Sequence, residues 1–231
     1  EITQYLYLNN AGKSFSLMEN HGVVSTDLGA TGAGAEVIDY DKDGDFDLVV
    51  NTNGRGYLLR NDGGTFTDVT ATLCSEITTG NLERTALFID LNNDGYPDIV
   101  RNDSNFLKIY LQIPNADPNL IRFGLSGGTA PNQTFDDPAF GGDFNSEGTG
   151  AIDFDGDGDL DIFVENHNYG IDILENDGNG FFTHATVKPP SYNVADPTTW
   201  PLGLVQDAVD GDYGAITDFN NDGWVDIVAR K

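Results

Sequence analysis

The stretch DYDKDGDFD, residues 39–47, puts five aspartates into nine residues with a single lysine among them. Carboxylates that lie this close repel one another, and folding makes the repulsion worse unless a positive charge lies among them. The composition of this stretch therefore predicts a bound cation.

The spacing of these residues matches the first nine positions of the calcium loop of EF-hands, in which position 7 offers its backbone carbonyl and a glycine at position 6 allows a sharp turn. Hard oxygen ligands in this number suit calcium better than zinc or copper. Position 12 is Val50 in the apolar run LVVN, where an EF-hand has a bidentate glutamate. The stretch is therefore predicted to be a calcium loop without flanking helices.

The pattern occurs four times, which argues against a merely solvated acidic turn. We call the copies loop 1 (39–47), loop 2 (90–98), loop 3 (153–161) and loop 4 (218–226). Positions 1, 5 and 9 are Asp, position 3 is Asp or Asn, and position 6 is Gly in every copy. We expect about four structural calcium ions, held by Asp39, Asp41, Asp43, Asp45, Asp47, Asp90, Asn92, Asp94, Tyr96, Asp98, Asp153, Asp155, Asp157, Asp159, Asp161, Asp218, Asn220, Asp222, Trp224 and Asp226.

The net charge limits the partners. The 231 residues carry a formal charge of -27, which four divalent ions would reduce to about -19, so we expect a fold that is much weaker without metal. Only 11 Lys and Arg are present, and this excludes a nucleic-acid partner, which would need them to neutralise phosphates. Such a surface is also repelled by anionic membranes, and no apolar run approaches the length of a spanning helix.

The expected calcium ions and the single cysteine indicate the compartment in which the protein works. Millimolar calcium is an extracellular condition, so we expect the protein outside the cell or on its surface. The single cysteine, Cys74, cannot form an internal disulfide, and we expect a buried thiol. The chain begins at Glu1 without a Met, which fits a mature or trimmed product.

Each loop is predicted to join two strands of a β-hairpin, because a short strand-like run precedes it and an apolar run follows it. A second hairpin with an Asn-Asp-Gly turn follows loops 1 and 3, and a longer version with proline follows loop 2. The sequences of these second hairpins are YLLRNDGGTFTDVT (57–70), LKIYLQIPNADPNLIRFG (107–124) and IDILENDGNGFFTHAT (171–186). Each repeat is thus four antiparallel strands, about one propeller blade.

The loops, together with YLLRNDGGTFTDVT and YLYLNNAGKSF, resemble the FG-GAP and VCBS-type repeats of integrin alpha chains and many bacterial secreted proteins. The resemblance covers nearly the whole chain except two inserts, 126–147 and 188–211. It implies an all-β propeller with calcium between the first two strands of each blade. It predicts function poorly, because such repeats occur in adhesion proteins, lectins and domains attached to enzymes.

The ends of the chain suggest how the blades are completed. Residues 2–18 match the second hairpin of a blade, and the last residues match a first hairpin with nothing after it. We therefore expect a single propeller domain of four blades, at about 32–72, 83–125, 148–187 and 212–231 plus 1–20. The last blade would close within one molecule or between neighbours joined head to tail, unless the chain is a cut from a larger propeller.

Catalysis is not expected. The three histidines occur alone, and the sequence contains no nucleophile motif, phosphate-binding loop or dinucleotide fingerprint. Aromatic residues in the two inserts are candidate contacts for a protein or glycan ligand, or cover their own loops. These candidates are Phe135, Phe140, Phe144, Tyr192 and Trp200.

The sequence as a whole predicts a secreted, calcium-stabilised propeller that acts as a recognition, adhesion or structural module. One alternative is a filament or surface coat made of copies of the chain joined through their terminal strands. The other is a polysaccharide-acting hydrolase or lyase, because paired carboxylates are plentiful.

Overall fold

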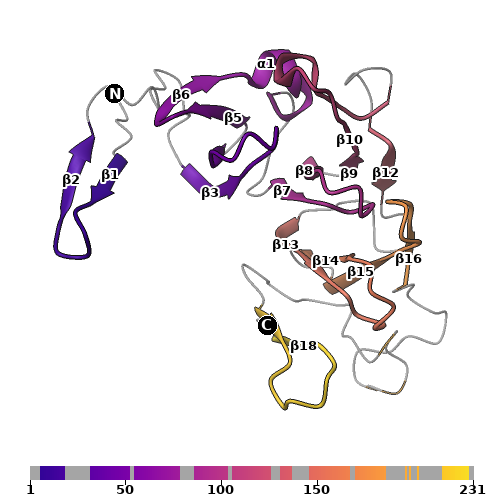
Figure 1. Cartoon of the computed structure of the whole chain (residues 1–231). Helices are drawn as coiled ribbons and strands as arrows, with labels where there is room; N and C mark the ends of the chain where they lie inside the picture. The colour runs from indigo at the N-terminus through magenta and orange to yellow at the C-terminus, as the bar shows by residue number, and fades with distance from the viewer. Residues whose placement is uncertain are drawn as a thin grey trace.

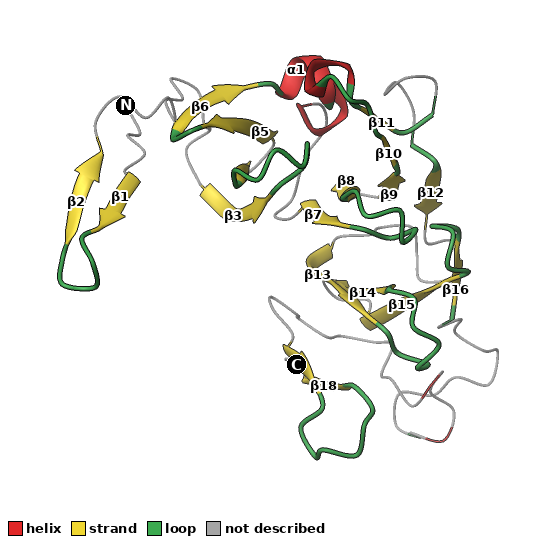
Figure 2. Ribbon diagram, in the orientation of Figure 1, coloured by secondary structure: helices red, strands yellow, loops and turns green. Residues whose placement is uncertain are grey.

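The computed structural model describes residues 6–18, 32–52, 55–78, 86–103, 106–125, 131–136, 146–166, 170–185, 196, 198, 202 and 215–228. Its strands form antiparallel sheets, and the helical segments among these residues are single turns (Figure 2). The all-β prediction is therefore confirmed. No helix within these ranges is both long enough and apolar enough to cross a membrane.

Two sheets follow the predicted four-stranded order. The first contains β3 (Gly32–Ile38), β4 (Asp47–Thr52), β5 (Arg55–Asp62) and β6 (Thr65–Asp68), paired in that order. The third contains β13 (Ser146–Ile152), β14 (Asp161–Asn166), β15 (Gly170–Asn176) and β16 (Phe182–His184) in the same order. Loops 1 and 3 connect the first two strands of these sheets, as the sequence predicts.

The second sheet differs from the prediction in its outer strand. It contains β7 (Ala86–Ile89), β8 (Asp98–Asp103), β9 (Phe106–Tyr110) and then β12 (Gln133–Asp136). The fourth strand was expected before residue 125, and it comes instead from the segment that was predicted to be an insert. The assignments of blade 2 to 83–125 and of an insert to 126–147 are wrong in this respect.

The reason lies in the residues between β9 and β12. Pro114 and Pro118 have no backbone N–H to donate to a strand ladder. The chain forms a two-residue pairing between β10 (Gln112–Ile113) and β11 (Arg122–Phe123), with a 3-10 turn, η2 (Pro118–Leu120), between them. Phe123 is buried and meets Phe88 edge to face, with ring centroids 6.3 Å apart. This segment therefore contributes to the core and leaves the sheet edge to β12.

The core lies between consecutive sheets. One buried cluster joins the first and second sheets through residues such as Leu58 and Phe88, and includes Leu73 of α1 (Thr70–Leu73) and Ile77 of η1 (Ser75–Thr78). A second cluster joins the second and third sheets through residues such as Val100. Full burial of one aliphatic side chain stabilises the fold by about 1.5–3 kcal/mol. The sheets are thus held face to face by apolar packing.

Two further hairpins lie at the ends of this arrangement (Figure 1). β1 (Leu6–Asn9) and β2 (Phe15–Met18) pack on the first sheet through Leu6, while β17 (Ala215–Thr217) and β18 (Asp226–Val228) pack on the third through Ile216 and Ile227. They form two separate two-stranded sheets. The fourth blade built from both ends is therefore not confirmed, because each hairpin packs on a different neighbouring sheet.

Candidate metal centre

The four loops have the same backbone shape. Their sixth residue is a glycine with a φ between 84° and 98°, a conformation that side chains rarely adopt. Their fourth residue also lies in the left-handed region, and asparagine or glycine occupies this position in three of the loops. The exception is Lys42 of loop 1, with φ of 60°. The repeated sequence pattern thus corresponds to one repeated turn.

The first aspartate of each loop is turned inward by the glycine at position 6. One of its carboxylate oxygens accepts a hydrogen bond from that backbone N–H, at 2.7–3.2 Å in the four loops. The fifth residue similarly accepts from the seventh, at 2.8–2.9 Å. The backbone therefore holds the carboxylates of positions 1 and 5 on the concave side of the loop, where a cation would lie.

In loops 1, 2 and 3 the aspartate at position 9 is buried and bonded on both oxygens. In loop 1, Asp47 accepts from the backbone N–H of Tyr40 at 3.1 Å and from that of Asn61 at 2.8 Å. Equivalent pairs hold Asp98 and Asp161, and all three carboxyl groups are almost completely excluded from solvent. This residue therefore fixes the loop to the end of the third strand of its sheet.

Burial raises the pKa of Asp47 and of Asp98 to about 7 and raises the pKa of Asp161. Hydrogen bonds from backbone N–H groups lower the pKa of each residue and oppose this increase. Nearby carboxylates raise the pKa further, and they lie at positions 3 and 5 in loops 1 and 3 and at positions 1 and 5 in loop 2. A divalent cation within the loop would reverse this repulsion and favour the charged form. The electrostatics of the loops thus fit a bound cation.

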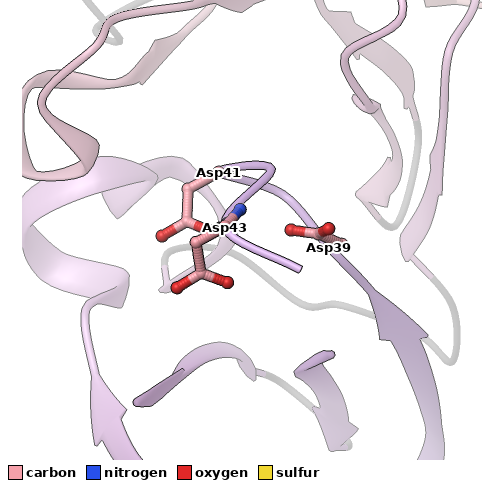
Figure 3. A group of neighbouring side chains, drawn as sticks. All are labelled: Asp39, Asp41 and Asp43. Carbon is pink, nitrogen blue, oxygen red and sulfur yellow. Dashed lines mark hydrogen bonds between the residues drawn. The ribbon is translucent and has the colours of Figure 1, made fainter. Parts of the chain in front are cut away.

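Two loops bring three carboxylates together. Ligand atoms of Asp39, Asp41 and Asp43 lie within 4.8 Å of one another, and the third loop gathers Asp153, Asp155 and Asp161 in the same way. Figure 3 shows the three side chains of loop 1. Loops 2 and 4 have an asparagine at position 3, so they offer fewer carboxylates. Neutral amide oxygens of this kind are also ordinary calcium ligands.

The orphaned oxygens of loop 1 test whether a metal fits. Asp39 Oδ1 and Asp41 Oδ2 are buried and have no hydrogen-bond donor among the residues that the structure describes. A buried carboxylate oxygen without a partner is costly, and a hard cation is the partner that the surrounding oxygens favour. The residues of loop 1 therefore fit calcium.

The residue at position 7 was predicted to use its backbone carbonyl, and two of the side chains there are engaged elsewhere. Asp45 accepts from the backbone N–H of Gly63 at 2.9 Å, and Asp159 accepts from the Asn93 side chain at 2.9 Å. Tyr96 and Trp224 occupy this position in loops 2 and 4. These observations agree with a backbone ligand at position 7.

Sequence reasoning missed a residue that supports each site. Asn61 and Asn176 lie at the end of the third strand of the first and third sheets, and Gln112 lies just after that of the second. The backbone N–H of each donates to the ninth aspartate. The asparagine of the Asn-Asp-Gly motif was interpreted only as part of a turn. An Asn or Gln recurs 14 or 15 residues after that aspartate in the three sheets, and this spacing is the signal that could have indicated the role.

The candidate ligand aromatics receive little support. Phe135 lies on β12, half-buried against the second core cluster, with its ring edge-on to His184 at 5.3 Å. This position favours packing over ligand contact. Phe140, Phe144, Tyr192 and Trp200 lie outside the described residues.

Cys74 is buried, as expected, and burial raises the pKa of its thiol. A thiol in this state is disfavoured as a nucleophile. His184 lies 3.6 Å from the buried carboxylate of Asp172 and is covered on one side by Phe135. The absence of catalysis stays a prediction.

Repeated antiparallel sheets, each with an acidic glycine loop between its first two strands, define a propeller-like repeat protein. The model of the FG-GAP-like repeat matches residues 39–101 and 153–229, more than half of the chain, and the chain therefore belongs to this family. No curated protein sequence matches it significantly.

Solved structures show a similar fold at low sequence identity. A lectin from Agrocybe aegerita that recognises non-reducing terminal N-acetylglucosamine is 19% identical, with a TM-score of 0.61, and 97% of this chain matches 54% of the lectin chain. This chain thus spans about half the length of the lectin chain.

Two other structures are more distant. The biofilm matrix protein Bap1 of V. cholerae is 15% identical, with a TM-score of 0.47 over 86% of this chain and 28% of Bap1. The Tc holotoxin pore of Photorhabdus luminescens is 20% identical, with a TM-score of 0.46 over 84% and 8% of the two chains.

Proposed function

We propose that this chain is a calcium-stabilised, propeller-like module that acts outside the cell in recognition or adhesion, without catalysis of its own. The observation that carries the proposal is the pair of orphaned carboxylate oxygens in loop 1, within a turn that the chain repeats four times. Oxygen-only loops of modest affinity suit the millimolar calcium of extracellular fluids. Bound calcium would also reduce the repulsion among the negative charges of a chain whose formal charge is -27.

The calcium part is tested by Asp157→Ala. This aspartate is the exposed fifth residue of loop 3, and its replacement removes one ligand without opening the core. A cation at about 100 times its dissociation constant stabilises a protein by about 2.7 kcal/mol. We expect the variant to lose several degrees of Tm in millimolar calcium and almost none in chelator, measured by scanning calorimetry.

Glu175→Ala is the matched control, because it removes one exposed carboxylate from the same sheet outside any loop. It should respond to calcium as the unmodified chain does. Equal destabilisation by Asp157→Ala in calcium and in chelator would assign the residue a purely structural role and contradict the calcium proposal.

The recognition part draws on the lectin that shares the fold, with a glycan or a protein surface as the ligand. A rigid repeat scaffold carries its ligand contacts on irregular loops, and the predicted insert 188–211 carries four prolines together with Tyr192 and Trp200. Binding to a glycan array in calcium, with no change in the glycans after incubation, is the expected result. Cleavage of any polysaccharide would favour the enzymatic alternative.

A second candidate function is self-assembly. The hairpin of β1 and β2 exposes Tyr7, Leu8, Phe15 and Leu17, each with about half or more of its surface in solvent. Exposed apolar residues on a two-stranded hairpin favour pairing with another copy of the chain. Light scattering in calcium would give an average molecular mass that increases with protein concentration if copies join head to tail. It would give the constant mass of the monomer if they do not.

A further inference from the structure

Neighbouring loops are joined by a buried side-chain amide. Gln112 Nε2 donates to the backbone carbonyl of Tyr40 at 3.0 Å, and Asn176 Nδ2 donates to that of Leu91 at 2.7 Å. Tyr40 and Leu91 are the second residues of loops 1 and 2. Gln112 lies on β10, just after the third strand of the second sheet, and Asn176 is the last residue of β15 in the third sheet. Both amide side chains are only 4% exposed, so water does not compete for these bonds.

The same two residues also hold the ninth aspartate of their own loop. The backbone N–H of Gln112 donates to Asp98 at 2.7 Å, and that of Asn176 donates to Asp161 at 2.8 Å. The other oxygen of Asp98 accepts from the N–H of Leu91 at 2.8 Å. A continuous buried chain of hydrogen bonds therefore runs from loop 1 through loop 2 to loop 3.

A second series of contacts joins the loops at the surface. The fourth residue of one loop meets the seventh residue of the next. Lys42 Nζ lies 4.0 Å from the centre of the Tyr96 ring, and Asn93 donates to Asp159 at 2.9 Å. A Cβ on Gly156 would come within 2.8 Å of the Trp224 ring. Position 7 is the one whose backbone carbonyl is expected to bind the cation.

We propose that Gln112 and Asn176 are positioning residues that couple neighbouring cation loops, so that a cation in one loop raises the affinity of the next. The inference rests on the proposed function, because it takes calcium as the cation. A cation in loop 2 would fix Asp98, which holds Gln112. Gln112 in turn holds Tyr40, the residue between two ligands of loop 1. A loop whose neighbour is already ordered has less conformational entropy to lose on binding.

The test uses the full chain and inactivates one loop at a time. Asp94→Ala removes the fifth residue of loop 2, and hydrogen exchange of the peptide that contains residues 39–47 then reports calcium binding in loop 1. We expect the calcium concentration that gives half-protection of loop 1 to rise at least about fivefold, the lower range of measured coupling between sites.

Three background variants assign the coupling to the amide. Gln112→Leu keeps the approximate volume of the side chain but removes the hydrogen-bond donor. When Asp94→Ala is added to this variant, the calcium concentration that gives half-protection of loop 1 should stay the same within about twofold. Gln112→Asn carries the residue found at this position in the other two sheets and should restore the coupling. Asn61→Ala is the matched control, because the Asn61 side chain donates to the carbonyl of Phe46 and accepts from the N–H of Gly64, both near its own loop, and the described residues give it no bond to another loop. Its backbone N–H to Asp47 is kept, so Asp94→Ala should still raise the loop 1 midpoint relative to Asn61→Ala alone.

Each outcome distinguishes the inference from the proposed function. An unchanged loop 1 midpoint in Asp94→Ala means independent loops and overturns the inference, even if Gln112→Leu does not fold. Coupling that persists in a folded Gln112→Leu also overturns it, because the amide would then only join the sheets. Protection of none of the four loops by calcium would refute the proposed function, and the inference with it.

Discussion

At the scale of single residues, Glu36 shows how the packing of sheets changes a side chain. It lies on β3 and accepts a hydrogen bond from the backbone N–H of Phe88, on the edge strand of the second sheet, at 3.2 Å. Burial raises the pKa of Glu36, and this hydrogen bond opposes the increase only in part. Folding therefore disfavours the charged form of Glu36 relative to the unfolded chain.

Glu36→Gln is expected to raise the free energy of unfolding at pH 7. A raised pKa in the folded state means that the protonated form contributes stability below the unfolded value of about 4.3, and this stability is lost as the pH rises through the folded pKa. Glutamine is neutral at every pH and keeps an oxygen for the Phe88 N–H. The variant should therefore be more stable than the unmodified chain at pH 7 and equal to it below about pH 4.

Urea denaturation at fixed calcium from pH 4 to pH 8 measures this difference. Glu175→Gln is the control, because Glu175 is exposed on β15 and the same change there should have little effect at any pH. A difference for Glu36→Gln that is independent of pH would mean that the carboxyl group does not titrate as proposed.

At the scale of elements, a side-chain amide joins the outer strand of the second sheet to the outer strand of the third. The amide of Gln133 on β12 accepts from the backbone N–H of Phe182 at 2.8 Å and donates to its carbonyl at 3.0 Å. Phe182 lies on β16, so this amide pairs with the outer strand as a neighbouring strand would. This contact explains how a segment predicted to be an insert becomes part of the fold.

Gln133→Leu is expected to destabilise the fold, because it leaves both backbone groups of Phe182 without their partners. Each unsatisfied group costs about 1–3 kcal/mol where water cannot replace the partner. We expect a total loss of about 2 kcal/mol in the free energy of unfolding, measured by urea denaturation in calcium.

Thr134→Ala is the matched control on the same strand, since Thr134 is exposed. It should change the free energy of unfolding by less than about 0.5 kcal/mol. If both variants were equally stable, water would be replacing the Gln133 amide, and the junction between the outer strands would not depend on it.

At the scale of the whole molecule, charge and sheet order act together. The sheets follow one another with their acidic loops in contact from one sheet to the next (Figure 1). A formal charge of -27 on 231 residues therefore repels itself most strongly where the loops meet. Screening by salt and neutralisation by calcium should each relieve part of this repulsion.

Without calcium, the Tm is therefore expected to rise by several degrees as sodium chloride increases from about 0.01 M to 0.5 M, because the screening length falls from about 30 Å to only a few ångströms. In millimolar calcium the same increase in salt should have a much smaller effect. Scanning calorimetry of the full chain at each condition measures both slopes.

Choline chloride serves as the control salt, since it screens charge without offering a cation that fits the loops. It should reproduce the effect of sodium chloride in the absence of calcium. A response to sodium alone would indicate sodium binding within the loops, and no response to either salt would mean that repulsion does not limit the stability of the chain.

The local spacing of residues in the sequence determined the four loops, the left-handed conformation of their glycines and the hairpins around them. Asp39, Asp41 and Asp43 converge as expected because their spacing and the turn at Gly44 are local properties. The same is true of the first and third sheets, whose strands are joined by short connections. The family could also be identified from the repeats.

Contacts between distant residues were decided only by the tertiary structure. β12 became the outer strand of the second sheet because Pro114 and Pro118 cannot continue a ladder and Phe123 found a place in the core. Gln112 and Tyr40 are 72 residues apart, as Asn176 and Leu91 are 85 apart, so no local pattern could link them. Local spacing specifies which groups can bind a cation, whereas the packing of one sheet on the next determines which loops touch.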